Sequence, residues 1–138
     1  MGSILRDMSY EFSETAVKHE VFKIGKPEGN LFEIEFTLTF SYGFLEYAHD
    51  FVWLNEDVEV LLKQIKEMDG KESGTFSVLS PSVSFSYSKY THEEGIYFFT
   101  VAMDTGYINA YMGTESNLGI TIKTTLTAIS TWVKSFLQ

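Results

Sequence analysis

Apolar and polar side chains alternate through the segment Leu31 to Phe40, and no other feature of the 138-residue chain constrains its fold as strongly. The apolar positions are Phe32, Ile34, Phe36, Leu38 and Phe40, and the polar positions between them are Glu33, Glu35, Thr37 and Thr39. Successive side chains of a β-strand project to opposite faces of its sheet. The segment therefore predicts a strand with one face against a core and the other face in water.

The neighbouring segments predict two more strands and then a helix. Residues Val17–Ile24 form a second candidate strand, joined to the first through a turn that contains Pro, Gly and Asn. Aromatic and β-branched residues from Tyr42 to Trp53 indicate a third, less regular strand. Asn55, followed by two acidic residues, predicts the cap and first turn of a helix. Gly70 is placed to end that helix in a left-handed conformation.

The second half of the chain returns to strands and ends in another helix. The candidate strands are Thr75–Leu79, Val83–Tyr87, Ile96–Met103 and a shorter Tyr107–Met112. Ile96–Met103 is apolar on both faces, so we expect a central strand covered on each side. Apolar spacing from Leu126 to Leu137 predicts a helix that Thr124 or Thr125 caps. Strands grouped in hairpins predict an α+β fold, mainly antiparallel sheet, ordered as three strands, a helix, three or four strands and a helix.

Chain length and the absence of an internal repeat favour one domain. Chain ends fray unless other elements hold them. We therefore expect residues 1–15 to form a flexible N-terminal arm and residues 16–138 to form a single α+β domain.

The charge balance of the chain bears on its partners and location. The formal net charge is −9, from 10 basic and 19 acidic residues, and this charge repels phosphate backbones and anionic lipid headgroups. We expect no direct binding to nucleic acid or to a membrane. The chain has no Cys, so disulfides and thiolate chemistry are excluded, and a cytoplasmic location is expected.

Acidic residues concentrate in the first half of the chain. Residues 1–72 carry 15 acidic and 7 basic side chains, whereas residues 73–138 carry 4 and 3. If the strand over residues 31–40 turns its apolar side inward, the outward and neighbouring acids form one patch: Glu33, Glu35, Glu46, Asp50, Glu56, Asp57 and Glu59. The patch is either a solubilising surface or a docking face for a basic protein. The aromatic residues expected beside it are Tyr42, Tyr47 and Trp53.

Two residue pairs could instead carry acid–base chemistry. His49 precedes Asp50, and His92 precedes Glu93, and a carboxylate can orient an imidazole for proton transfer. No metal-ligand spacing, nucleotide-binding loop or nucleophile motif is present, so we predict no metal site, no cofactor and no catalytic residue. A small acid–base enzyme and a carrier of a small ligand stay open as alternatives.

One resemblance favours the docking interpretation. Trp53-Leu54 before the Asn55-initiated helix, the stretch Leu79-Ser80-Pro81-Ser82-Val83-Ser84-Phe85, the apolar strand Ile96–Met103 and the terminal helix resemble the WapI family of small immunity proteins. The resemblance implies that the protein protects its producing cell by binding a toxic nuclease domain. We therefore expect a cytosolic acidic protein that inhibits a basic effector stoichiometrically, without turnover.

Overall fold

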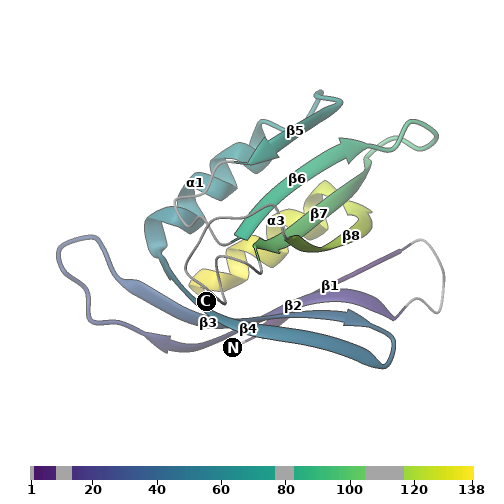
Figure 1. Cartoon of the computed structure of the whole chain (residues 1–138). Helices are drawn as coiled ribbons and strands as arrows, with labels where there is room; N and C mark the ends of the chain where they lie inside the picture. Colours follow the sequence, from purple (N-terminus) through teal and green to yellow (C-terminus); the bar gives the residue numbers. More distant parts are fainter. Residues whose placement is uncertain (1, 9–13, 77–82, 105–116) are drawn as a thin grey trace.

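Each half of the chain forms a four-stranded antiparallel sheet followed by a helix (Figure 1). The computed structural model describes residues 2–8, 14–76, 83–104 and 117–138. The first half contains β1 (Gly2–Arg6), β2 (Thr15–Ile24), β3 (Glu33–Tyr42), β4 (Leu45–Leu54) and α1 (Asn55–Lys66). The second half contains β5 (Ser73–Phe76), β6 (Val83–Lys89), β7 (Ile96–Asp104), β8 (Asn117–Thr125), α3 (Leu126–Lys134) and the 3₁₀ helix η1 (Ser135–Leu137). The strands follow chain order in both sheets, so the predicted α+β fold with antiparallel sheet is confirmed.

The strand predicted from the alternation over residues 31–40 is present in the structure as β3. Its apolar side chains from Ile34 to Phe40 are buried, while Glu33 is exposed and Glu35 is half-buried on the opposite face. Strands β2 and β4 pair with β3 on either side, both antiparallel. The β3–β4 connection is a two-residue turn, and Gly43 in that turn has a φ of 63° that favours glycine.

The prediction of a flexible arm over residues 1–15 is wrong for residues 2–6. These residues form β1, which pairs with residues 16–20 of β2, and Leu5 is only 3% exposed. The chain then runs along the other sheet, since the Met8 N–H donates to the Lys123 carbonyl over 3.0 Å and Asp7 Oδ1 accepts from the Lys123 N–H over 2.8 Å. Burial of Leu5 and these hydrogen bonds hold the segment in place.

The carboxy-terminal sheet differs from the prediction at two strands. β7 is central, but only one of its faces is fully covered, because Phe98 and Thr100 on the other face are half-exposed. β8 was not predicted, and its inward side chains include the buried Ile120 and Ile122. The predicted strand Tyr107–Met112 lies outside the described residues, as does the end of Thr75–Leu79.

The core lies between the two sheets, and α3 contacts strands of both (Figure 1). The Trp132 ring lies 5.0 Å from the His19 ring of β2 and 6.4 Å from the Phe99 ring of β7, measured between centroids. Phe136 of η1 lies 4.9 Å from Phe36 of β3. Aromatic contacts therefore join the two sheets through the terminal helical segment.

The two helices begin differently. The Thr125 hydroxyl accepts from the Ala128 N–H over 3.1 Å, which confirms the predicted cap of α3. The predicted cap of α1 is wrong, because Asn55 is already the first helical residue and the Asp57 carboxylate accepts from the Leu54 N–H over 2.9 Å. Neither helix in the described part of the chain is long and apolar enough to cross a membrane.

Candidate functional site

The candidate site is the outer face of the amino-terminal sheet, which we define as the face turned away from the core, together with the adjoining start of α1. Glu33 and Glu35 project from this face on β3, and Glu46 and Asp50 project from it on β4. Asp50 lies opposite Thr37, whose hydroxyl donates to Asp50 Oδ1 over 2.6 Å. The strand alternation thus places these four predicted acids on one side of the sheet.

Cations of the same chain lie on the other half of this face. Lys18 and Lys23 of β2 and Arg6 of β1 project outward beside a single acid of β2, Glu20. Lys23 Nζ lies 3.5 Å from Glu35 Oε2 in a surface ion pair. The outer face is therefore divided, with positive charge on the β1–β2 side and negative charge on the β3–β4 side.

Two predicted partner-binding residues are buried and so do not belong to this surface. Trp53 is 2% exposed, because it lies opposite Ile34 on β4 and turns its ring inward, 4.9 Å from the Phe36 ring. Asp57 is 4% exposed, and its carboxylate holds the Leu54 N–H at the start of α1. The prediction that these two side chains contact a partner is wrong, since both are enclosed by the protein's own structure.

The aromatic contribution to the surface lies at the β3–β4 turn. Tyr42 donates its hydroxyl hydrogen to the Gly119 carbonyl of β8, and burial raises the pKa of this phenol above its ordinary value. Tyr47 lies opposite Phe40, so it projects to the core face of the sheet and not to the outer face, and it is half-buried there. Phe44, which is not among the predicted residues, is fully exposed at the tip of the turn, and Leu45 is 73% exposed beside it. The Tyr42 hydrogen bond fixes this turn against the other sheet.

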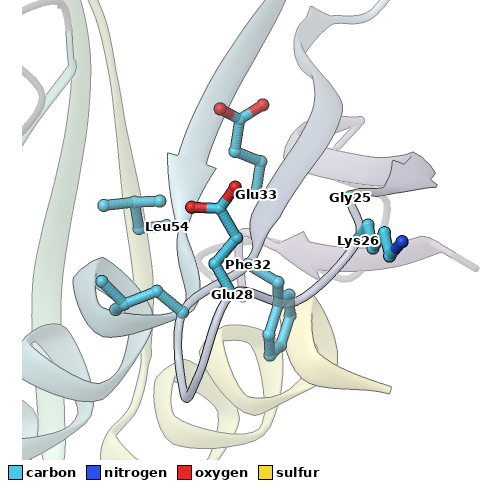
Figure 2. A pocket seen from close by; sticks show the side chains of 7 residues that line it. Gly25, Lys26, Glu28, Phe32, Glu33 and Leu54 are labelled. Atoms are coloured by element: carbon cyan, nitrogen blue, oxygen red, sulfur yellow. The ribbon is translucent and has the colours of Figure 1, made fainter.

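At the opposite end of β3, the β2–β3 loop is held by Asn55. The Phe32 N–H donates to Asn55 Oδ1 over 3.0 Å, and Asn55 Nδ2 donates to the Asn30 carbonyl over 2.9 Å. A cleft of about 340 Å³ lies against this loop, and the carboxylates of Glu28 and Glu33 line it (Figure 2). Asn55 thereby fixes the loop that forms the wall of the cleft.

A second cleft, of about 680 Å³, lies between the same loop and α1. The predicted residues Glu56 and Glu59 line it and are exposed. Phe32 is the one aromatic residue among the described residues that line either cleft. These clefts do not match the enclosed aromatic cavity that a carrier of a small ligand would use.

The structure does not bring the His49 ring and the Asp50 carboxylate together. His49 and Asp50 are adjacent on β4 and project to opposite faces, so the imidazole Nδ1 meets the Asp50 carbonyl at 2.8 Å while the carboxylate binds Thr37. His92 lies on the exposed β6–β7 loop with its ring 5.4 Å from that of Tyr90. In the parts of the chain that the structure describes, no three His, Asp or Glu side chains are grouped so as to hold a metal ion.

The third histidine, His19, is buried in the core. Its Nε2–H donates to the Trp132 carbonyl over 2.8 Å, and its ring stacks on Phe136 at a centroid distance of 3.7 Å. Burial lowers the pKa of His19 to about 4, and the bond to the carbonyl offsets only part of this shift. His19 is therefore neutral at pH 7 and joins β2 to the end of α3.

No protein-family model matches the chain, and the search of curated proteins finds no match either.

Proposed function

We propose that this protein is a stoichiometric inhibitor that captures a basic partner protein through the β3–β4 side of its outer face and the start of α1. The observation that carries the proposal is the series of exposed carboxylates along this side of the sheet and the first turn of α1. The contributing residues are Glu33, Glu46, Asp50, Glu56 and Glu59. Among the described residues none of these five lies within 4 Å of a cation. No ion pair within the described residues therefore neutralises them, although Glu46 lines a pocket with Arg6 and Lys18 and Glu33 lines one with Lys26.

The physical basis of the proposal is electrostatic complementarity. Opposite charge raises the rate of association and disfavours partners of the wrong sign. Phe44 and Leu45 offer exposed apolar surface beside Glu46, and apolar anchors supply much of the affinity in protein interfaces. Carboxylates that cover the partner's basic surface block access to it, so inhibition needs no turnover.

The finer role that we propose is immunity against a toxin in the cytoplasm. A nuclease domain must approach phosphates and is often basic, which makes it a suitable target for a chain with a net charge of −9. The resemblance to the WapI family points to the same role. We therefore propose a toxic nuclease domain as the partner.

Affinity capture from the producing cells, with the wild-type protein immobilised, tests the proposal at low and at high salt. We expect a basic protein in stoichiometric amount that high salt releases. Glu46→Lys combined with Asp50→Lys should weaken the purified complex about tenfold and reduce its salt dependence.

The matched control is Glu93→Lys combined with Glu94→Lys, which changes the net charge equally on the exposed β6–β7 loop. We expect the control to bind within about twofold of the wild type, because its charges lie away from the proposed surface. An equal loss in both double variants would mean that total charge, and not this surface, governs binding. An eluate without a stoichiometric protein would contradict the proposal itself.

A further inference from the structure

The two sheets have four edge strands, which are β1, β4, β5 and β8. Among the described residues, β4 is the long edge strand whose free side is left open. β4 has ten residues, whereas β1 has five and β5 has four. The edge of β8 is met by Asp7 and Met8, which bond the backbone of Lys123, and by the Tyr42 hydroxyl on Gly119. Nothing in the described part of the chain pairs with β4 on the side away from β3. A long open edge is a template for another strand.

The hydrogen bonds of β4 identify which backbone groups face this edge. The Leu54 N–H bonds the Asp57 carboxylate and the Asp50 carbonyl accepts from the His49 ring, so neither group is directed at β3. Backbone groups of successive strand residues alternate in direction. The N–H groups of Glu46, Ala48, Asp50 and Val52 therefore point outward, and all four residues are exposed.

The side chains along the edge indicate what kind of strand fits there. Glu46, Ala48, Asp50 and Val52 project on the outer face, so two carboxylates and two small apolar groups flank the open N–H groups. Opposite charges directly across a strand pair are favourable, and like charges are unfavourable. A second copy of this chain would bring its own two carboxylates to the seam, whereas a segment with alternate Lys or Arg would neutralise them.

The other face of β4 restricts the remaining positions of the added strand. Tyr47 and His49 are half-buried there, and Phe51 is buried. Side chains of an added strand that point to this face would lie beside the two half-buried rings. Apolar residues suit these positions because they would extend the apolar surface of the core.

We infer that β4 accepts an extended segment of the partner as a fifth, antiparallel strand of the amino-terminal sheet. Basic side chains of the segment lie on the outer face beside Glu46 and Asp50, and apolar side chains alternate with them beside Tyr47 and His49. The inference rests on the proposed function and adds the mode of recognition. In this mode of recognition, main-chain hydrogen bonds set the register of the added strand, and Glu46 and Asp50 select a basic segment.

Four ten-residue peptides test the inference on the wild-type protein. The first alternates lysine and valine, and the second alternates glutamate and valine. The third peptide is the lysine–valine peptide with a methyl group on the backbone nitrogen of each lysine. The fourth is the lysine–valine peptide with a methyl group on the backbone nitrogen of each valine. In the antiparallel arrangement the lysine N–H groups face β4 and the valine N–H groups face away. Methylation of lysine thus blocks the ladder without changing the charge.

We expect the lysine peptide to bind at least about tenfold more tightly than the glutamate peptide and than the lysine-methylated peptide. The valine-methylated peptide should bind within about twofold of the unmodified one. Hydrogen exchange should slow at the amides of residues 46, 48, 50 and 52 when the lysine peptide is added. Equal binding of the two methylated peptides would overturn strand addition.

Ala48→Pro gives an independent test, because it removes one outward N–H and leaves the charge and the β3–β4 ladder unchanged. We expect it to weaken the lysine peptide about tenfold, while Ala48→Val stays within about twofold. If Ala48→Pro does not fold, the peptide series on the wild type still decides.

The two proposals fail in different ways. Tight binding of the lysine peptide without an effect of methylation would keep the basic partner and reject strand addition. Equal binding of the glutamate and lysine peptides, with methylation weakening the lysine peptide, would keep edge pairing and reject the basic partner.

Discussion

The two halves of the molecule have the same order of elements but offer different surfaces. Each half is a four-stranded antiparallel sheet that leads into a helix. The amino-terminal sheet ends in the ten-residue open edge of β4 and belongs to the strongly acidic part of the chain. The carboxy-terminal sheet has a four-residue edge at β5, a covered edge at β8 and few charges. The shared architecture therefore does not by itself distinguish the halves, and the binding that we propose is placed on the half with the open acidic edge.

The largest expected effect comes from breaking the connection between the halves at Trp132. Trp132→Ala removes a buried ring between His19 and Phe99 and should lower the free energy of unfolding by about 3–5 kcal/mol. Because the ring touches both sheets, we expect both to unfold in one transition. Urea unfolding followed by circular dichroism, with hydrogen exchange of β3 and β7, measures this.

Trp132→Phe is the control, since it keeps an aromatic ring and removes a buried indole N–H that has no hydrogen-bond partner among the described residues. Its loss of stability should be clearly smaller. Exchange protection that persists in one sheet of the alanine variant while the other is lost would show that the halves are separately stable.

The second prediction concerns pH and the same connection. His19 has a pKa of about 4 in the folded protein and 6.5 as its ordinary value, so the unfolded state binds more protons between these pH values. The contribution of neutral His19 is therefore complete above pH 6.5 and is lost as the pH falls toward 4. It amounts to about 3 kcal/mol.

His19→Gln keeps a side-chain donor near the Trp132 carbonyl but does not titrate. Urea unfolding of both proteins from pH 4 to pH 7 gives the free energy of unfolding at each pH. As the pH falls, we expect this free energy to decrease more in the wild type than in His19→Gln, whatever the difference between the two proteins at pH 7. Parallel curves would mean that His19 titrates normally in the folded protein.

Much of the fold could be predicted because the alternation is local. The apolar positions of β3 and of Val83–Tyr87 recur at every second residue, and their strands follow directly. β1 could not be recognised because Ile4 and Leu5 are its only strongly apolar residues, and its place depends on β2. An apolar run such as β7 has the same sequence pattern whether one or both of its faces are covered. The half-exposed position of Phe98 could therefore be predicted only with knowledge of the strand order.

The site was predicted only in part, for related reasons. Alternation correctly turned Glu33 and Glu35 outward, but the lysines of β2 beside them depend on the register between strands. Trp53 was misplaced because the third strand was not assigned a register, and opposite Ile34 it must face inward. The free edge of β4 depends on the strand order, which could not be predicted from the sequence.

The third prediction compares the side-chain hydrogen bonds of Asn55, which hold the β2–β3 loop, with the cap bond of Thr125 at the start of α3. Asn55→Ala removes the acceptor of the Phe32 N–H and the donor to Asn30 at a buried position, and should cost about 1–3 kcal/mol. Thr125→Ala removes a single cap bond and should cost about 1 kcal/mol. Thermal unfolding gives both values, and Thr125→Ser should restore the second. No loss of stability in Asn55→Ala would show that the β2–β3 loop does not depend on Asn55.

The smallest effect on stability is expected at Lys23. Substitution of this residue also tests directly whether the charges of the outer face govern peptide binding. The ion pair of Lys23 with Glu35 is largely exposed, so Lys23→Gln should change the free energy of unfolding by less than about 0.5 kcal/mol. The same change frees a carboxylate beside β4 and should tighten binding of the alternating lysine and valine peptide about two- to threefold at low salt.

Lys26→Gln is the matched control for this effect. It changes the net charge equally. Lys26 lies on the β2–β3 loop and lines the cleft there, but its ammonium is directed away from Glu28 and Glu33 (Figure 2) and it forms no ion pair of 4 Å or less with a described acid. Titrations at low salt and at about 0.5 M salt separate a local effect from a general one, because the higher salt shortens the screening length to about 4 Å. If Lys26→Gln tightens binding as much as Lys23→Gln, net charge alone attracts the peptide, and the division of the outer face into a positive and a negative side has no part in recognition.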